Sequence, residues 1–215
     1  MIFDWNEHYK DGGKSGDPES YNISRSWKKD IISKYCNVKT DSIIDIGCGD
    51  LQFWANKLPA HYTGIDLSQT IVERNKVLYP ESKFIVSNAA NQLDISSDTV
   101  MCFDMLWHII DDDDYVKILT NIKRYSNKYI ILYTWNSNVF DKGIVHRLFT
   151  SLVNLKHGKG LSFKQIDDDG GYQKYRDFLK IAMPIFEPEF RLIDTYTNEH
   201  WTEGTMYIFK SGDHL

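Results

Sequence analysis

The segment Ser42-Ile-Ile-Asp-Ile-Gly-Cys-Gly-Asp50, with the acid Asp66 downstream, decides the fold of this chain. Its apolar run 42–46 ends in glycines, which is typical of a buried parallel strand that enters a turn. Gly47 and Gly49 would let a ligand approach the backbone, because no Cβ stands in the way. Asp66 ends the next apolar run, where an acid that binds ribose hydroxyls is expected. These features alone fit either a dinucleotide or an adenosyl ligand.

Further details separate these two ligands. The dinucleotide pattern G-x-G-x-x-G requires a third glycine at the position of Gln52. The bulky run 51–53 occupies the place where a pyrophosphate would approach a helix N-terminus. Asp45 and Asp50 would repel a pyrophosphate but suit a ligand that carries an ammonium and a sulfonium. The first basic residue after the strand is Lys57, too late to hold a phosphate at the turn.

At this point the sequence resembles a known family, the class I S-adenosylmethionine-dependent methyltransferases. Residues 43–50 resemble its motif I, and 62–68 resemble its second motif. Residues 98–109 resemble its fourth-strand motif, whose loop usually faces the methyl donor. The resemblance covers roughly 41–136 and implies a seven-stranded sheet whose last strand is antiparallel. The sequence departs from the family at Leu51, where many members have a third glycine.

The resemblance also implies which residues hold S-adenosylmethionine. In the stretch 84–89 the family often has an acid that contacts the adenine amino group. Asn88 occupies that place here, and an amide can still read the adenine edge. Asp104 could contact the methionine part of the donor or the substrate, or could simply order its loop. The expected cofactor-binding residues are Asp45, Gly47, Cys48, Gly49, Asp66, Leu67, Asn88, Ala89 and Asp104.

The order of apolar segments predicts the fold class. Short strands alternate with amphipathic helices, which indicates βαβ units and a parallel sheet. Strands are predicted at 42–46, 61–65, 83–87, 99–103 and 128–134, and helices at about 20–35, 53–58, 68–78 and 111–125. The last two strands, 190–197 and 205–210, are joined so closely that they should pair antiparallel. We therefore expect an α/β, Rossmann-like, doubly wound seven-stranded sheet, mostly parallel, with an antiparallel C-terminal strand.

The whole chain, 1–215, is predicted to be a single methyltransferase domain made of consecutive segments. Residues 1–40 form an N-terminal helical or lid segment, and 41–138 form the cofactor-binding core. Residues 139–188 form an insertion that caps the substrate, and 189–215 form the C-terminal strand hairpin.

The overall composition favours a reduced intracellular compartment. The three cysteines are far apart, form no CxxC pair and have no zinc-ligand spacing. No apolar run is long enough to cross a bilayer, and the N-terminus lacks the features of a signal peptide. We expect a cytoplasmic protein without a membrane partner, and the sequence leaves its oligomeric state open. The net charge of −5 makes a nucleic-acid partner unlikely, because phosphate neutralisation needs clustered Lys and Arg.

The residues that follow the fourth and fifth strands are candidates for catalysis and substrate binding. His108 is the candidate general base, because it follows the fourth strand and its ordinary pKa suits proton transfer at neutral pH. The alternative is that it only caps the turn. Trp107, Trp135 and Asn136 are candidates for the substrate face, because ligands bind at the carboxyl ends of strands. Alternatively, the two tryptophans pack beneath the insertion.

The glycine-rich N-terminal segment 9–16 is predicted to be either a lid over the cofactor cleft or an ordinary surface loop. Gly supplies hinges, and Trp5 and Tyr9 could close on a ligand; Tyr9 is therefore a further substrate-site candidate. The acidic run 111–114 could hold a hard cation, but it also suits the N-terminal dipole of a helix. We expect no metal site.

These features favour methyl transfer from S-adenosylmethionine to an O or N nucleophile of a small molecule. The chain is acidic, has no appended recognition domain, and carries an aromatic-rich insertion that could roof a pocket. Alternatives are a methyltransferase acting on a protein or peptide, and a non-catalytic adenosyl-binding subunit of a complex. An NAD-dependent oxidoreductase is a further alternative.

Overall fold

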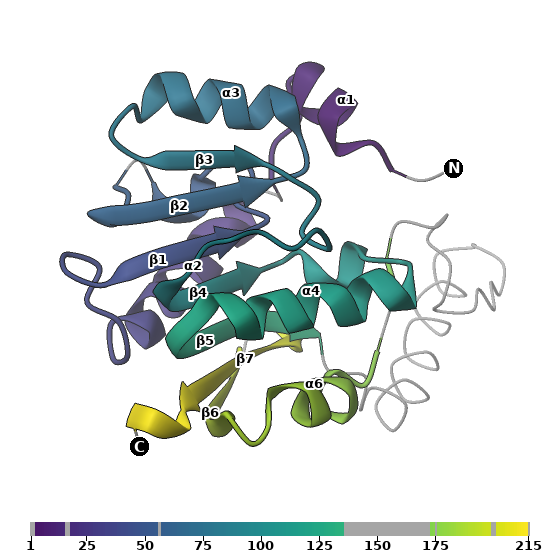
Figure 1. Cartoon of the computed structure of the whole chain (residues 1–215). Coiled ribbons are helices and arrows are strands. Elements are labelled where there is room, and N and C mark those ends of the chain that lie inside the picture. The colour runs from purple at the N-terminus through teal and green to yellow at the C-terminus, as the bar shows by residue number, and fades with distance from the viewer. Residues whose placement is uncertain are drawn as a thin grey trace, which may run out of the picture.

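A seven-stranded mixed sheet forms the centre of the molecule in the computed structural model, which describes residues 3–15, 18–55, 57–135, 173–174, 176–198 and 201–214 (Figure 1). The strand order is β3-β2-β1-β4-β5-β7-β6. The strands are β1 Ser42–Ile46, β2 His61–Asp66, β3 Lys83–Val86, β4 Ser97–Phe103, β5 Ser126–Trp135, β6 Phe190–Asn198 and β7 Trp201–Ser211. β1 to β5 pair in parallel, whereas β7 runs antiparallel to both of its neighbours, β5 and β6. The fold class predicted from the sequence is therefore confirmed.

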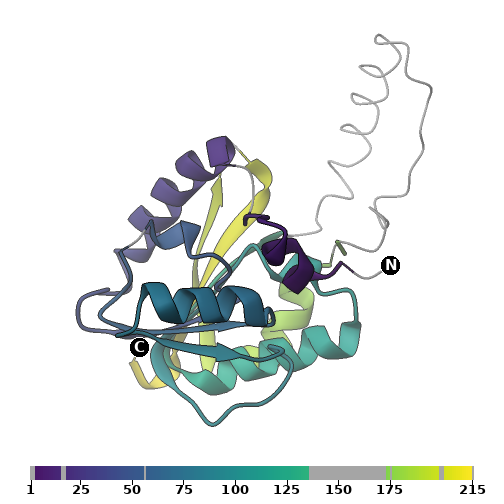
Figure 2. The same cartoon turned by 90° about the horizontal axis from the view of Figure 1, so that it is seen from above.

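Helices cover both faces of this sheet. They are α1 Trp5–Lys10, α2 Pro18–Ile32, α3 Gln69–Leu78, α4 Asp112–Tyr125 and α6 Phe178–Phe186. Figure 1 shows α4 and α6 in front of the sheet and α2 behind it. Seen from above in Figure 2, α1 and α2 stand apart, with α1 close to the N-terminal end of α3. Within the described ranges, no helix combines the length and apolarity that a membrane crossing requires.

Alternation along the strands builds two separate cores. Ile43 packs into the core shared with α2 and α3, whereas Ile44 packs into the core shared with α4 and α6. In β5 the same alternation sends Ile131 to the first core and Leu132 to the second. Successive side chains of a strand point to opposite faces, so a strand buried on both sides reads as a continuous apolar run.

Polar side chains cap the starts of two helices. Ser68 caps α3, because its Oγ accepts the backbone N–H of Ile71 at 3.4 Å. Asp111 caps α4 by accepting the N–H of Asp114 at 2.8 Å, and Asp112 to Asp114 fill the acidic first turn. The acids of this run therefore stabilise the N-terminus of a helix.

The segment after β1 differs from the prediction. The sequence indicated a helix at 53–58, but the structure has one turn of 3-10 helix, Gln52–Trp54. This turn is flanked by two residues in the left-handed region, Leu51 at φ 61° and Ala55 at φ 49°. A right-handed helix cannot continue through such residues, so the chain turns back toward β2 after a single turn. The short α1 near the N-terminus was not predicted.

Candidate functional site

The turn after β1 packs closely against other parts of the chain. Gly47 and Gly49 both have positive φ, at 74° and 52°. A Cβ on Gly47 would lie 2.7 Å from Met105 Sδ, and one on Gly49 would lie 2.6 Å from Ser15 Oγ and 2.8 Å from the Tyr9 hydroxyl. The absence of a side chain therefore lets Met105, Ser15 and Tyr9 lie directly on the turn. The glycines were predicted to let a ligand approach the backbone; in the structure, side chains of the chain itself lie close to them.

Asp66 ties the turn to the end of β2. Its two carboxylate oxygens accept the backbone N–H groups of Gly49 and Ser68, each at 2.9 Å. Burial raises the pKa of Asp66, and the amide hydrogen bonds oppose this shift. The side chain remains partly accessible, so it keeps the position at the carboxyl edge that the sequence predicted.

The residues that follow Asp66 and β3 leave the carboxyl ends of these strands accessible to solvent. The side chain of the next residue, Leu67, is 59% exposed. Asn88, after β3, is also exposed, and its Oδ1 accepts the backbone N–H of Ala90 at 2.9 Å. Ala89 is partly buried and its carbonyl accepts from Asn121. The carboxyl ends of the paired strands β2 and β3 therefore place a carboxylate, an apolar side chain and an amide along one edge.

Asp45 lies in the interior rather than at this edge. It is 5% exposed, and its Oδ2 accepts both the Trp54 indole N–H at 2.9 Å and the Tyr62 hydroxyl at 2.8 Å. Burial raises the pKa of Asp45 to about 6, against the effect of these two hydrogen bonds. The observed contacts of Asp45 brace β1 against β2 and the 3-10 turn, and its contribution to ligand binding stays a prediction. Cys48, next to the turn, is likewise buried, at 9% exposure.

A buried ion pair holds the loop after β4. Asp104, at φ 58°, pairs with Lys28 of α2, whose Nζ lies 2.5 Å from Asp104 Oδ2. The Lys28 side chain is 3% exposed, and its ammonium lies 3.7 Å from the centre of the Tyr133 ring. Burial lowers the pKa of Lys28, and the charge of Asp104 raises it again. The side chain of Asp104 is 31% exposed, so this pair reaches from the core beneath α2 to the carboxyl edge of the sheet.

Aromatic rings gather beyond this pair, at the ends of β4 and β5. Trp107 stacks on Trp135 with ring centres 4.6 Å apart and planes at 11°. The Trp107 indole N–H donates to His108 Nε2 at 2.9 Å, and His108 lies edge-on to Trp5 of α1 at 5.1 Å. The Tyr133 ring lies edge-on to Trp107, with ring centres 6.3 Å apart. The structure thus brings the candidate base and two candidate substrate residues together; Asn136 lies outside the described residues.

The hydrogen bond from Trp107 constrains how His108 could act. An indole N–H can only donate, so His108 Nε2 must be unprotonated while this bond persists. The proton of the neutral imidazole is then on Nδ1. For Nε2 to take a proton from a substrate, the bond from Trp107 must first open.

The N-terminal segment lies over the glycine turn. Tyr9 is buried, its hydroxyl bonds with Ser15 Oγ at 2.9 Å, and the backbone N–H of Ser15 donates to Asp50 at 3.2 Å. Asn6 accepts from Ser68 Oγ at 3.1 Å and from the backbone N–H of Thr70 at 3.0 Å. α1 is therefore joined to the start of α3 and to the turn after β1, the position that the lid hypothesis requires.

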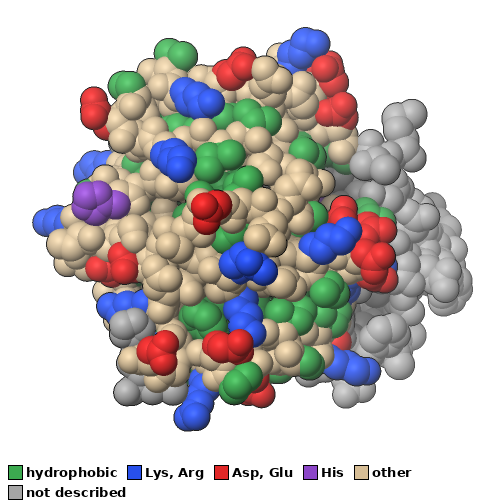
Figure 3. Space-filling model, in the orientation of Figure 1, with side chains coloured by type: hydrophobic (Ala, Val, Ile, Leu, Met, Phe, Trp, Pro, Cys, Tyr) green, Lys and Arg blue, Asp and Glu red, His purple; other side chains and the backbone are tan. Residues whose placement is uncertain are grey.

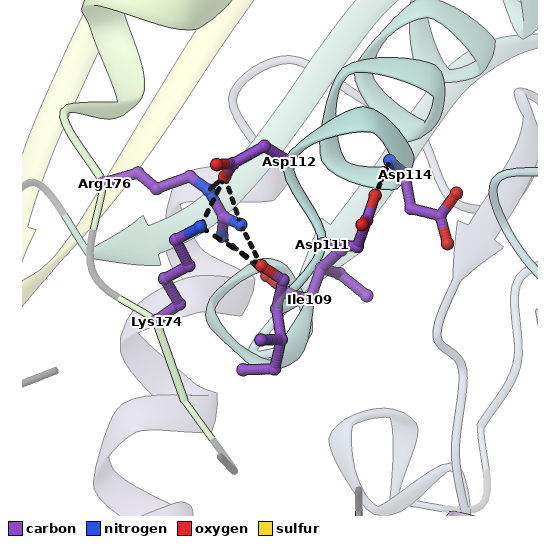
Figure 4. Close-up of polar contacts among 7 residues, drawn as sticks. Ile109, Asp111, Asp112, Asp114, Lys174 and Arg176 are labelled. Carbon is purple, nitrogen blue, oxygen red and sulfur yellow. Dashed lines mark hydrogen bonds and ion pairs between the residues drawn. The ribbon is translucent and has the colours of Figure 1, made fainter. Parts of the chain in front are cut away.

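The loop that carries Trp107 and His108 is held from the other side by the chain that precedes α6 (Figure 4). Arg176 is 8% exposed and donates to Asp112 and to the carbonyls of Ile109 and Ile110 at 2.6–2.9 Å. Lys174 joins the same Asp112 carboxylate at 2.8 Å. The acid that could have been read as a metal ligand is thus engaged by two cations. Among the residues that the structure describes, no three His, Cys, Asp or Glu side chains form a group able to hold a metal ion.

Sequence reasoning missed two side chains that organise this region, Lys28 and Ser15. Lys28 stands at one position of an amphipathic helix among other basic residues, so its spacing does not distinguish it. Ser15 lies in a loop whose path over the turn depends on the docking of α1. In both cases the signal is a contact between segments far apart in sequence.

Comparison with known proteins gives the class. Residues 43–128 match the family model described as a methyltransferase domain. The matched residues run from β1 to the start of β5 and carry a methyltransferase domain, that of an enzyme with S-adenosylmethionine as cofactor. No curated protein matches the sequence.

Solved structures with the same fold are distant in sequence. Magnesium protoporphyrin IX methyltransferase from Synechocystis, crystallised with S-adenosylhomocysteine, superposes with a TM-score of 0.57 at 18% identity, over 90% of this chain and 83% of that one. A methyltransferase from Clostridium acetobutylicum has a TM-score of 0.57 at 15% identity, covering 92% and 93%. The N-methyltransferase NodS from Bradyrhizobium japonicum has a TM-score of 0.59 at 10% identity, covering 91% and 99%. These likenesses show the fold, not the acceptor.

The residues at the carboxyl edge fit an adenosyl ligand. The partly accessible carboxylate of Asp66 suits ribose hydroxyls, because carboxylates accept hydrogen bonds. The exposed Leu67 offers apolar surface to a flat ring, and Asn88 offers an amide to its polar edge. The Tyr9 and Ser15 hydroxyls stand over the turn, and burial raises the pKa of Tyr9, so this phenol stays protonated as a donor.

Proposed function

We propose that this chain transfers the methyl group of S-adenosylmethionine to an oxygen or nitrogen nucleophile of a small molecule. The observation that carries the proposal is the aromatic cluster of Trp5, Trp107, His108 and Trp135 at the carboxyl ends of β4 and β5. These ends lie beside the glycine turn, because β1 pairs with β4 and β4 with β5. Stacked rings can position a flat or cationic acceptor next to the methyl donor.

When bound, the cofactor supplies a methyl group on a positively charged sulfur, so the protein need only align the acceptor and manage its proton. We assign the donor contacts to Asp66, Leu67 and Asn88, and we place the acceptor against Trp107 and Trp135. His108 is the proposed general base. Its Nε2 becomes available when the hydrogen bond from Trp107 opens.

Turnover on a panel of acceptors tests the proposal. The purified chain is incubated with S-adenosylmethionine and with amines, phenols, carboxylic acids or peptides, and S-adenosylhomocysteine is measured by mass spectrometry. We expect product with small molecules. Product with peptides alone would assign a peptide methyltransferase, and donor binding without turnover on any acceptor would support the non-catalytic subunit. NAD binding without S-adenosylmethionine binding would overturn the whole assignment.

Matched variants test the residue assignments. We expect Asp66→Ala to weaken S-adenosylmethionine binding about tenfold or more, as one lost charge-assisted contact costs about 1.5–3 kcal/mol. Asp94→Ala, at an exposed acid after β3, is the control and should leave the affinity unchanged. Trp107→Phe keeps a ring but removes the hydrogen bond from Trp107 to His108 Nε2. If His108 is the base, this variant keeps substantial turnover, whereas His108→Asn loses about 100-fold or more.

A further inference from the structure

A basic groove lies away from the proposed methyl-transfer site. It runs between the end of α2, the turn 37–41 and the chain just after the 3-10 turn, with a volume of about 810 Å³. Five lysines line it: Lys29, Lys34, Lys39, Lys57 and Lys128. They come from three segments far apart in sequence, in a chain whose net charge is −5. The turn before β1 and Lys128 near the start of β5 place it toward the amino ends of these strands, opposite to the carboxyl edge.

Three of these ammonium groups are held in place rather than freely solvated. Lys29 donates to the carbonyl of Trp54 at 3.2 Å. Lys34 lies 4.7 Å from the centre of the Tyr196 ring, and Lys128 lies 5.3 Å from that of Tyr129. Such contacts orient a cation without neutralising it. The groove therefore has preorganised positive charges, which lowers the entropic cost of binding an anion.

One acid, Asp41, lines the groove together with the five lysines, and two more, Asp98 and Asp194, lie close to it. Asp41 accepts the backbone N–H of Asn37 at 2.9 Å and the Thr40 hydroxyl. Asp98 accepts both the backbone N–H and the hydroxyl of Ser42, and these bonds together with the charge of Lys128 lower its pKa. Asp194 accepts the hydroxyl of Tyr35, another lining residue. Across the described chain, none of the five lysines forms an ion pair with an acid.

The lysines also affect one another. Partial burial lowers the pKa of Lys29, and the charges of Arg25 and Lys57 lower it further. On the face that Figure 3 shows, by contrast, Lys and Arg side chains alternate with Asp and Glu over α3, α4 and α6. An excess of charge of one sign in a concave site attracts the opposite charge.

We propose that this groove binds a small molecule that carries two or more phosphate groups. The volume lies in the range of small-molecule sites, about 300–1,000 Å³. A long polyanion such as RNA needs positive charge extended well beyond one groove, whereas the rest of this chain is acidic. The proposal does not depend on the identity of the methyl acceptor, because the groove lies at the opposite end of the sheet.

Titration with inorganic tripolyphosphate at low ionic strength tests the site. The variant Lys39→Gln/Lys57→Gln removes two exposed lysines of the groove, and Lys76→Gln/Lys83→Gln removes two exposed lysines outside it. Both variants change the net charge equally. We expect the groove variant to weaken the affinity by about tenfold or more and the control by less than about twofold. Equal weakening in both, or no measurable binding to the parent chain, would overturn the proposal.

Nuclear magnetic resonance locates the bound probe and separates the alternatives. We expect tripolyphosphate to shift the amide signals of the turn 37–41 and to leave those of Gly47 and Gly49 unchanged. Shifts confined to the glycine turn would contradict a separate groove. A 20-nucleotide RNA is the second ligand. If it binds through the same lysines while tripolyphosphate does not bind, the small-ligand assignment is wrong and the groove is a nucleic-acid surface.

Discussion

At the scale of single residues, the buried carboxyl of Asp45 makes stability depend on pH. Its pKa in the folded chain is about 6, above the ordinary value of about 3.9 in an unfolded chain. The folded state therefore binds a proton that the unfolded state releases between these values. The stabilisation that comes from protonated Asp45 is fully present below about pH 4. It is lost as the pH rises through 6, which lowers the free energy of unfolding by about 3 kcal/mol in total.

Asp45→Asn tests this dependence. The amide oxygen can still accept from Trp54 and Tyr62, but it does not titrate. We expect the difference in free energy of unfolding between the parent chain and the variant to fall by up to about 3 kcal/mol between pH 4 and pH 7. Urea unfolding at several pH values measures it. A difference that is constant with pH would show that Asp45 keeps an ordinary pKa.

The buried pair of Lys28 and Asp104 should respond unequally to the loss of each partner. Asp104→Asn leaves a buried ammonium without its counter-charge, which costs about 3–5 kcal/mol. Lys28→Met keeps the apolar stem and leaves a carboxylate that is 31% exposed and can be hydrated, so we expect about 1–2 kcal/mol. Asn tolerates the left-handed backbone at position 104 as Asp does, so backbone strain adds no separate cost to the Asp104→Asn variant.

Thermal or urea unfolding of both single variants and the double variant measures this pair. The double variant should be less destabilised than the sum of the two singles, because it leaves no unpaired charge. Equal and additive losses would mean that the two charges are not coupled.

At the scale of elements, the Asn6 side chain bonds α1 to α3, while Tyr9 and Trp5 pack α1 against the core. Asn6→Ala removes two hydrogen bonds to the start of α3. We expect faster amide hydrogen exchange in α1 and the loop that follows, with global stability changed by less than about 1 kcal/mol. If this segment is a lid, the affinity for S-adenosylmethionine should also fall.

Glu7→Ala on the same helix is the control, because its carboxylate meets Lys10 at the exposed surface. Unchanged exchange in the Asn6 variant would show that α1 is held by its aromatic packing instead. Deletion of 1–20 with unchanged donor affinity would contradict the lid.

The connection after β1 shows why element type is hard to predict locally. Apolar spacing at 53–58 suits a helix, yet Leu51 adopts the left-handed conformation that favours glycine. A buried position at 3% exposure compensates for this strain, which is a tertiary effect. The departure of Leu51 from the family pattern is visible in the sequence, but its conformation is not.

At the scale of the whole molecule, the C-terminal hairpin completes the sheet. β7 lies between β5 and β6, and its residues 206–209 alternate between the two cores with no more than 1% exposure. Each such side chain contributes about 1.5–3 kcal/mol on burial. A chain ending at residue 188 should therefore lose cooperative unfolding in circular dichroism and aggregate in size-exclusion chromatography.

A chain ending at Ser211 keeps both strands and is the matched control. We expect it to unfold close to the full-length midpoint. A folded, monomeric 1–188 chain would show that the parallel part of the sheet is stable alone. It would contradict the expectation that both cores need the side chains of β7.

The sequence by itself determined the fold class, the position of the glycine turn and the acid at Asp66, because these follow from local periodicity and from residue types. It also pointed to His108, Trp107 and Trp135 as candidates for catalysis and the substrate face, since ligands bind at the carboxyl ends of parallel strands. The division into segments 1–40, 41–138, 139–188 and 189–215 stays a prediction.

Only the tertiary structure decided which side chains from distant segments are in contact. It buried Asp45 beneath Trp54 and Tyr62, placed Lys28 on Asp104, and laid Tyr9 over Gly49. It also gathered five lysines from three segments into one groove. The physical reason is common to all of these. Burial, charge pairing and steric contact depend on distances between segments far apart in the chain, and local sequence patterns do not contain those distances.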